Sequence, residues 1–155
     1  MTELYLVQHG EAKSEHEDPA RPLTDRGRQE AQRVARAAAR LGLEIAEIAH
    51  SGKRRAQETA EILAAQLKPA RGLTHRTGLA PLDDPAIARQ AMDQATESHM
   101  LVGHLPHLSR LASLLLVGDR AKEIVAFRMG GIVCLSREED RWRLKWILTP
   151  ELVSQ

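Results

Sequence analysis

Two histidines and one arginine follow short apolar runs, and these residue types together suit phosphoryl transfer. His9 comes directly after the apolar residues 4–7, His104 follows residues 100–103, and Arg55 lies just beyond a third apolar run. A neutral imidazole is a good nucleophile toward phosphorus near pH 7. A second imidazole, held protonated, and a guanidinium can neutralise the phosphoryl oxygens, and the guanidinium can bind two of them at once. This set suffices for the reaction without a metal ion or organic cofactor.

The elements that must position these residues alternate between strands and helices. Apolar runs predict strands at residues 4–7, 45–49 and 100–103, with a further strand at 73–77. Apolar residues at helical spacing predict helices over 24–41, 54–67, 85–94 and about 108–115, the first capped by Thr24 and ended by Gly42. Two closing strands, 132–136 and 141–148, flank a turn, and alternation places Trp142, Leu144, Trp146 and Leu148 on one face.

This order of elements predicts an α/β fold. We expect a three-layer α/β/α sandwich with a mainly parallel sheet and a C-terminal antiparallel hairpin. Residues 1–155 fit one domain. In such sheets ligands bind at the carboxyl ends of the strands, which is where the two histidines and the arginine fall.

Composition excludes several other classes of function. The 22 basic and 21 acidic residues leave a net charge of +1, so no basic field favours nucleic acid or an anionic membrane. The longest apolar run, residues 114–117, is far too short to span a bilayer, and the N-terminus does not resemble a signal peptide. A single cysteine, Cys134, excludes an internal disulfide and multi-cysteine metal sites. We therefore expect a cytoplasmic protein.

Four segments, in order, resemble motifs of the histidine phosphatase superfamily, the relatives of cofactor-dependent phosphoglycerate mutase. They are Leu6-Val7-Gln8-His9-Gly10-Glu11-Ala12, Arg21-Pro22-Leu23-Thr24 with Gly27, Ser51 with Arg55-Ala56-Gln57-Glu58-Thr59, and Val102-Gly103-His104-Leu105-Pro106. They resemble an Arg-His-Gly opening, R-P-L-T-x-x-G, S-P-x-x-R-A-x-Q-T and a second-histidine motif. Together they span residues 4–108, about two thirds of the chain. The short length, R-P-L-T and H-L-P are most similar to SixA-type protein phosphohistidine phosphatases.

The resemblance implies a role for each matching residue. His9 takes the place of the phosphorylated histidine, Arg55 that of a phosphate-binding arginine, and His104 that of the second histidine. Gly10 and Arg21 are expected at the phosphate site beside them.

Two departures from the family pattern concern charge and acid catalysis. Gln8 stands where the family has its first arginine, so one phosphate-binding cation is missing, and Arg21 or Arg54 is a candidate to replace it. Larger members carry a glutamate after the third strand, and here Asp83 or Asp84 is the nearest candidate. Alkoxide leaving groups need a general acid, whereas an imidazole needs far less help, which favours P–N substrates such as phosphohistidine.

Other polar residues near these motifs have ordinary structural interpretations. We expect Ser51 to cap the following helix rather than touch substrate. His107, one helical turn after His104, is expected at the surface near the site.

The sequence thus predicts a phosphatase with a phosphohistidine enzyme intermediate, acting on phosphohistidine of a partner protein and releasing inorganic phosphate. Two alternatives stay open. One is a small-molecule O-phosphatase of the same fold. The other is a non-catalytic phosphate- or phosphoprotein-binding module, to which Gln8 points. The partner, the general acid, the effect of Gln8 on rate and the oligomeric state do not follow from the sequence.

Overall fold

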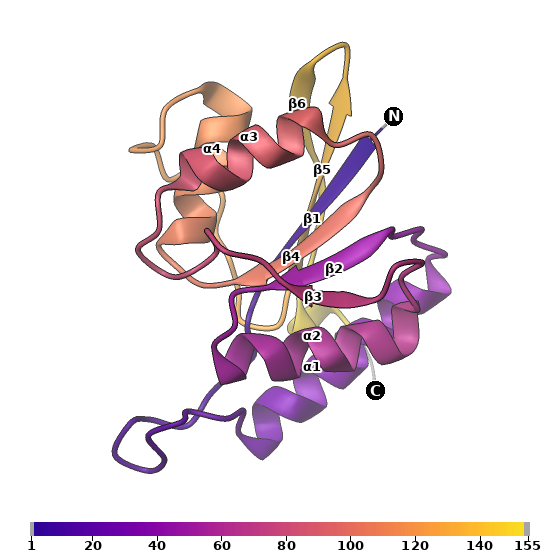
Figure 1. The fold of residues 1–155 in the computed structure, drawn as a ribbon. Coiled ribbons are helices and arrows are strands. Elements are labelled where there is room, and N and C mark those ends of the chain that lie inside the picture. The colour runs from indigo at the N-terminus through magenta and orange to yellow at the C-terminus, as the bar shows by residue number, and fades with distance from the viewer. Residues whose placement is uncertain (1, 154–155) are drawn as a thin grey trace.

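A sheet of six strands lies at the centre of the structure, a computed structural model that describes residues 2–153 (Figure 1). The strands are β1 (Thr2–Gln8), β2 (Glu47–His50), β3 (Leu73–His75), β4 (His99–Gly103), β5 (Ile132–Glu138) and β6 (Arg141–Leu148). Their order across the sheet is β3-β2-β4-β1-β5-β6. The strands β1 to β4 run parallel, and β5 and β6 form an antiparallel hairpin beside β1. The predicted sheet is confirmed.

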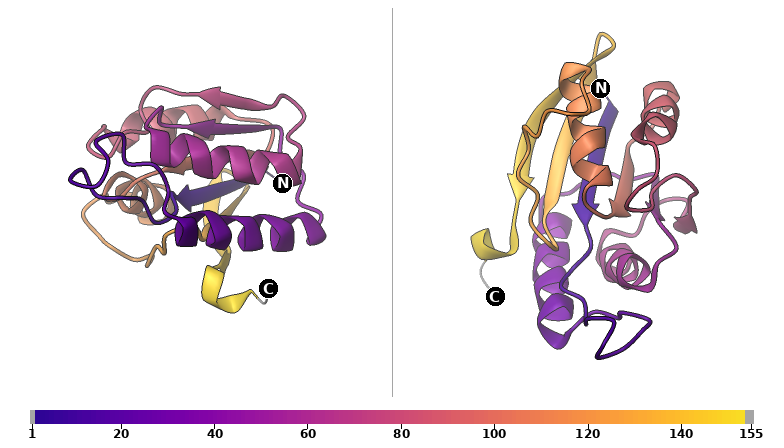
Figure 2. Two further views of the ribbon diagram at one scale, coloured as in Figure 1. Left: turned by 90° about the horizontal axis from the view of Figure 1, so that it is seen from below. Right: turned by 90° about the vertical axis from the view of Figure 1, so that its left-hand side faces the viewer.

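Helices cover both faces of this sheet and complete three layers (Figures 1 and 2). They are α1 (Asp25–Arg40), α2 (Arg54–Leu67), α3 (Pro85–Gln94) and α4 (His107–Val117), with a short 3-10 helix at Pro150–Leu152. Side chains of β1 alternate between the faces, so that Tyr5 and Val7 pack with α1 and α2, whereas Leu4 and Leu6 pack with α3 and α4. None of the helices in residues 2–153 has the length and apolarity to cross a membrane.

The start of α1 is fixed against the loop that follows β1. The hydroxyl of Thr24 accepts a hydrogen bond from the Gly27 N–H, as the N-cap prediction requires. The Thr24 hydroxyl also donates to the carboxylate of Glu11 at 2.7 Å. A Cβ at Gly27 would lie 2.2 Å from the backbone oxygen of Glu11, so only glycine allows this approach. This contact holds the chain in place just beyond His9.

The closing strand β6 departs from simple alternation. Its register against β5 shifts by one residue, which leaves Lys145 as a bulge. Trp142 packs on the side of α3 and α4, Trp146 and Leu148 pack on the side of α1 and α2, and Leu144 is 45% exposed. The prediction that the four residues share one face is therefore wrong, because one extra residue reverses the alternation.

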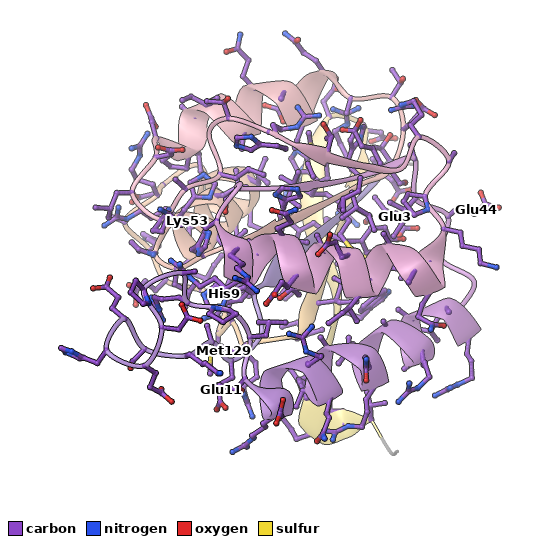
Figure 3. All side chains as sticks on the ribbon, turned by 60° about the horizontal axis from the view of Figure 1, so that its bottom comes forward. Glu3, His9, Glu11, Glu44, Lys53 and Met129 are labelled. Atoms are coloured by element: carbon purple, nitrogen blue, oxygen red, sulfur yellow. The ribbon has the colours of Figure 1, made fainter. Side chains whose placement is uncertain are left out.

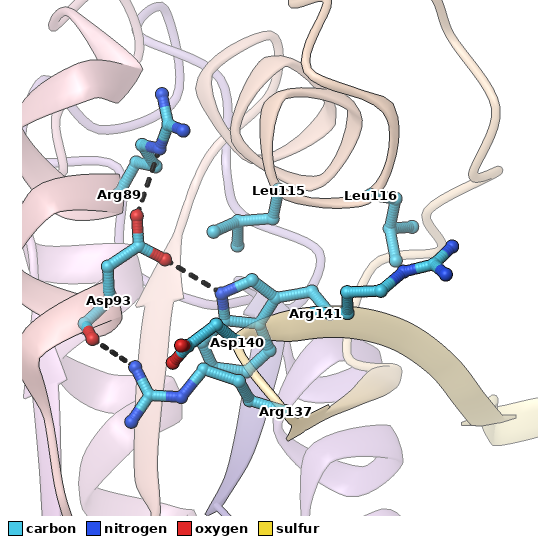
Figure 4. A pocket seen from close by; sticks show the side chains of 8 residues that line it. Arg89, Asp93, Leu115, Leu116, Arg137, Asp140 and Arg141 are labelled. Atoms are coloured by element: carbon cyan, nitrogen blue, oxygen red, sulfur yellow. Dashed lines mark hydrogen bonds and ion pairs between the residues drawn. The ribbon is translucent and has the colours of Figure 1, made fainter.

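The sheet edge far from the carboxyl ends of β1, β2 and β4 holds a cavity of about 360 Å³ (Figure 4). There the carboxylate of Asp93 accepts hydrogen bonds from Arg89 (3.0 Å) and from the indole N–H of Trp142 (2.9 Å). The Arg137 guanidinium donates to three carbonyls at the C-terminal end of α3. These contacts fasten the end of α3 to the β5–β6 hairpin.

Candidate active site

The polar residues singled out in the sequence meet at the carboxyl ends of β1, β2 and β4. The rings of His9 and His104 lie 5.1 Å apart, centre to centre, at an angle of 54°. The backbone N–H of His9 donates to the carbonyl of Gly103 at 3.0 Å, so the two strand ends hold the two histidines side by side. In Figure 3, His9 lies with Lys53 at one end of the molecule, and Glu3 lies at the other.

A short chain of hydrogen bonds sets the orientation of His9. Its Nδ1 lies 2.7 Å from the carbonyl oxygen of Gly10, which can only accept, so Nδ1 carries the proton and the Nε2 lone pair is left for attack. The N–H of Gly10 donates to the Thr59 hydroxyl (3.0 Å), and that hydroxyl donates to the carbonyl of Arg55 (2.8 Å). Both backbone groups of Gly10 are thus occupied in positioning His9. Thr59, the last residue of the arginine segment, is a positioning residue that our sequence analysis missed.

The electrostatic environment keeps His9 neutral. Burial, together with the positive charges of Arg55 and Arg21, lowers the pKa of His9 to about 4, against the opposing effect of its bond to Gly10. The imidazole is therefore uncharged at pH 7 and able to act as a nucleophile.

His104 is also neutral before an anion enters the site. Burial lowers its pKa to about 3, with further contributions from His9, Arg55 and Lys53. The expectation that this histidine is held protonated therefore fails for the site without an anion. A phosphoryl dianion beside the two rings would raise both pKa values again. Its Nδ1 is buried and has no hydrogen-bond partner among residues 2–153.

Ser51 contacts His104 and does not cap α2. Its hydroxyl oxygen lies 2.6 Å from Nε2 of His104. The residue that precedes α2 is Lys53, and no side chain caps the first turn of that helix. The Lys53 N–H donates to the Ser51 oxygen at 3.3 Å, which leaves the serine hydrogen free to donate to His104. The capping prediction is wrong, because the partner of the Ser51 hydroxyl is His104, 53 residues away in sequence.

Arg55 brings a guanidinium to the site from the first turn of α2. Its Nε is buried and lacks a hydrogen-bond partner in the described part of the chain. Burial and the charge of Arg21 lower the pKa of Arg55, whereas Glu15 raises it. A buried donor without an acceptor is costly, and a bound anion would supply that acceptor.

The three residues linked to the missing cation lie in different places. Arg21 acts electrostatically on both His9 and Arg55, and its Nε donates to the Lys13 carbonyl at 3.0 Å. Arg54 instead points to Glu58 on the same helix, at 3.2 Å, with more than half of its side chain exposed. Gln8 ends β1, and its carbonyl accepts from the Gly130 N–H at 2.9 Å. Of the two candidates to replace the missing charge, the geometry favours Arg21.

The two candidate acids are engaged in local structure. Asp83 accepts from the N–H of Ala80 (3.0 Å), and Asp84 caps α3 and pairs with Arg120 at 2.7 Å. His107, expected at the surface, is fully buried at the start of α4, and burial lowers its pKa. Within residues 2–153, no three His, Cys, Asp or Glu side chains converge as a metal site.

Known proteins resemble this chain in sequence and in fold. Residues 4–83 match the sequence profile of the histidine phosphatase superfamily (branch 1). An uncharacterized protein of Picosynechococcus sp. strain PCC 7002 is 33% identical over 142 residues, which cover 86% of this chain and 84% of that protein.

Solved structures show the same fold at lower identity. The protein histidine phosphatase SixA complexed with tungstate superposes with a TM-score of 0.86 at 22% identity, over 97% of this chain and 98% of that one. A putative phosphohistidine phosphatase SixA from Agrobacterium tumefaciens gives 0.78 at 24%, over 96% and 98%. A putative alpha-ribazole-5'-P phosphatase from Escherichia coli K-12 gives 0.77 at 17%, over 97% and 98%. The resemblance seen in four short motifs thus extends over the fold, and the chain belongs to the histidine phosphatase superfamily, branch 1.

Proposed function

We propose that the protein is a phosphatase in which His9 accepts the phosphoryl group as an enzyme-bound phosphohistidine, and that its substrate is phosphohistidine on a partner protein. The observation that carries this proposal is the fixed tautomer of His9, whose Nδ1–H donates to Gly10 and leaves Nε2 as a buried, neutral nucleophile. Two similar structures with SixA in their names support the choice of substrate.

The reaction follows in two displacements at phosphorus. His9 Nε2 attacks, a P–N bond forms to the enzyme, and the P–N bond to the substrate histidine breaks as the leaving imidazole takes a proton from solvent. Water then attacks the phosphorylated His9, which releases inorganic phosphate and restores the neutral ring. Arg55 and His104 donate to the phosphoryl oxygens in both steps, with Arg21 adding positive charge.

The hydrogen bonds of the two candidate acids favour a P–N substrate. Asp83 and Asp84 are occupied by a turn, a helix cap and an ion pair. A sugar or alkyl alkoxide leaves slowly without a general acid, whereas an imidazole leaves readily.

A small-molecule O-phosphatase is the second candidate. Glu15 favours it, because this carboxyl in the loop after β1 acts electrostatically on Arg55 and is a candidate proton donor for an alkoxide. The putative alpha-ribazole-5'-P phosphatase with the same fold is consistent with such a substrate.

The test compares leaving groups on one enzyme preparation. Three substrates are supplied separately: a protein whose histidine has been phosphorylated by phosphoramidate, a sugar phosphate, and p-nitrophenyl phosphate. The phosphate released from each is measured against enzyme-free blanks. We expect the highest kcat/KM with the phosphohistidine protein, and Glu15→Gln to leave that value unchanged.

The other outcomes identify the alternatives. Faster turnover of the sugar phosphate, lost in Glu15→Gln, would establish the O-phosphatase. Tight binding of the phosphorylated protein with no turnover would establish the binding module that Gln8 suggests.

A further inference from the structure

The segment Ser51–Gly52–Lys53 connects β2 to α2 and holds His104 in place. Its serine hydroxyl lies 2.6 Å from Nε2 of His104 and accepts from the Lys53 N–H. The position of that hydroxyl depends on the backbone on either side of it, because neither the helix nor the strand includes residue 51. Whatever fixes the backbone of this segment therefore fixes the partner of His104.

His50, the last residue of β2, fixes that backbone. Its Nδ1 accepts a hydrogen bond from the Gly52 N–H at 3.0 Å. A backbone N–H can only donate, so Nδ1 carries no proton and His50 is neutral in this arrangement. The ring is 7% exposed and stacks on His75 of β3, with centres 5.9 Å apart and planes within 9°.

His75 closes the other side of the segment. The backbone of Gly52 has φ of +92°, and a Cβ there would lie 2.7 Å from Nε2 of His75. The left-handed backbone favours glycine here, and a side chain at this position would also displace the exposed His75 ring. The family motif has proline at this position, and proline has no N–H to donate. The bond from Gly52 to His50 is therefore a feature of this chain and not of the motif.

We propose that His50 is a positioning residue for the reaction: by accepting from Gly52 it holds Ser51 against His104, and it releases this hold when it is protonated. The inference rests on the proposed function for its catalytic consequence. Protonation of the neutral ring places a hydrogen on Nδ1, facing the Gly52 N–H. An acceptor becomes a second donor, the bond is lost, and Ser51 is free to leave His104.

The surroundings of His50 set where this happens. Burial and the neighbouring His75 lower its pKa, and Glu61 of α2 opposes them. On the other side, β4 places the uncharged side chain of Val102 opposite His50. Because the pKa lies below the ordinary range, the segment is held at neutral pH and released as the solution becomes acidic.

The test uses two substitutions of His50, one that keeps a hydrogen-bond acceptor for the Gly52 N–H and one that removes it. In His50→Asn the amide oxygen can occupy the place of Nδ1 and accept from Gly52 but does not titrate. In His50→Phe the ring remains and the acceptor is lost. His99 supplies matched controls, His99→Asn and His99→Phe, because it is also buried and sits at the far end of β4 with its Nδ1 on a backbone carbonyl.

Turnover of the phosphohistidine protein is measured from pH 5 to 8, with the spontaneous hydrolysis subtracted. At pH 7.5 we expect His50→Phe to lower kcat about three- to tenfold, the value of one hydrogen bond, with a smaller change in KM. His50→Asn should restore kcat, and its activity should persist to lower pH than that of the wild type. The His99 variants should keep the wild-type pH profile.

Amide hydrogen exchange gives a readout that does not need turnover. We expect the Gly52 amide to exchange faster in His50→Phe than in the wild type or His50→Asn. If wild-type activity is normal but His50→Phe leaves kcat, the pH profile and Gly52 exchange unchanged, the inference is wrong and the proposed function stands. If the wild type shows no turnover, the proposed function fails and Gly52 exchange alone decides whether His50 holds the segment.

Discussion

The two edges of the sheet use similar residues in opposite ways. At the far edge, Arg137 and Asp93 meet carbonyls, a guanidinium and an indole N–H, so each charged group has its partners. At the edge with the histidines, Nε of Arg55 and Nδ1 of His104 are buried without partners within the described residues. Arg137 lies 5.5 Å from the centre of the Trp142 ring, and Arg55 acts electrostatically on His9 and His104. The difference between them is the presence or absence of an acceptor, and a bound anion would supply the acceptor that the Arg55 and His104 nitrogens lack.

The largest effect is expected from His9→Ala. Removing the nucleophile should lower kcat more than about a thousandfold, because no second group replaces the covalent step. The fold should persist, since the Gly10 amide keeps its bond to Thr59. Circular dichroism and turnover of the phosphohistidine protein check both statements. Substantial remaining turnover would remove His9 from the nucleophilic role.

A pair of arginine substitutions tests the difference between the two edges most clearly. Arg55→Gln should lower kcat/KM about tenfold to a hundredfold, because a charge-assisted contact to the phosphoryl group is lost. Without an anion, its unfolding free energy should stay within about 0.5 kcal/mol of wild type or rise, since repulsion from Arg21 is relieved.

Arg137→Gln should do the reverse. Loss of the donors to the end of α3 should lower the unfolding free energy by about 2–3 kcal/mol and leave kcat/KM unchanged. Urea unfolding and steady-state kinetics of the two variants, side by side, provide the measurement. If both variants lost stability and kept activity, the two edges would not differ as we infer.

Gln8→Arg tests whether Arg21 replaces the positive charge that Gln8 lacks. Arg21 already acts on His9 and Arg55, so a third guanidinium should repel both and misplace them. We expect kcat/KM to fall a few-fold, measured on one phosphohistidine protein at fixed ionic strength. A gain of roughly tenfold, one charge-assisted contact, would mean that Gln8 is a weakened arginine that Arg21 does not replace.

The smallest effect concerns stability in acid. His9 and His104 have folded-state pKa values of about 4 and about 3, below the 6.5 of an unfolded histidine. The unfolded chain therefore binds more protons below pH 6.5, and the stability conferred by neutral rings is lost as the pH falls from 6.5 toward those values. Unfolding free energies measured between pH 7 and 4 should decline less steeply in His104→Asn than in wild type. Equal slopes would show that these rings do not contribute.

Much of the fold could be predicted because its signals are local. The bounds of α2, α3 and β6 agree with the predicted ranges. Pro85 is the first residue of α3, and the structure adds that Asp84 caps this helix. The bulge at Lys145 could not be predicted, since alternation in the sequence does not show where a partner strand takes one residue fewer.

The candidate site also contains residues that local signals predict and residues that only packing determines. That His9, Arg55 and His104 lie together could be predicted because each follows a predicted strand, and parallel strand ends meet at one edge. Ser51 and His107 were misjudged, because their environments depend on packing between β2, β4 and the start of α4. Contacts between distant segments leave no mark in the spacing of residues along the chain.

Trapping the covalent intermediate would show directly whether His9 accepts the phosphoryl group. The enzyme is mixed with the phosphohistidine protein, quenched in alkali within milliseconds to seconds, digested and analysed by mass spectrometry, with His9→Ala in parallel. We expect one acid-labile, alkali-stable phosphoryl group on His9, formed and lost at rates that match turnover. Turnover without a phosphorylated peptide containing His9, or with the label on another residue, would contradict this expectation.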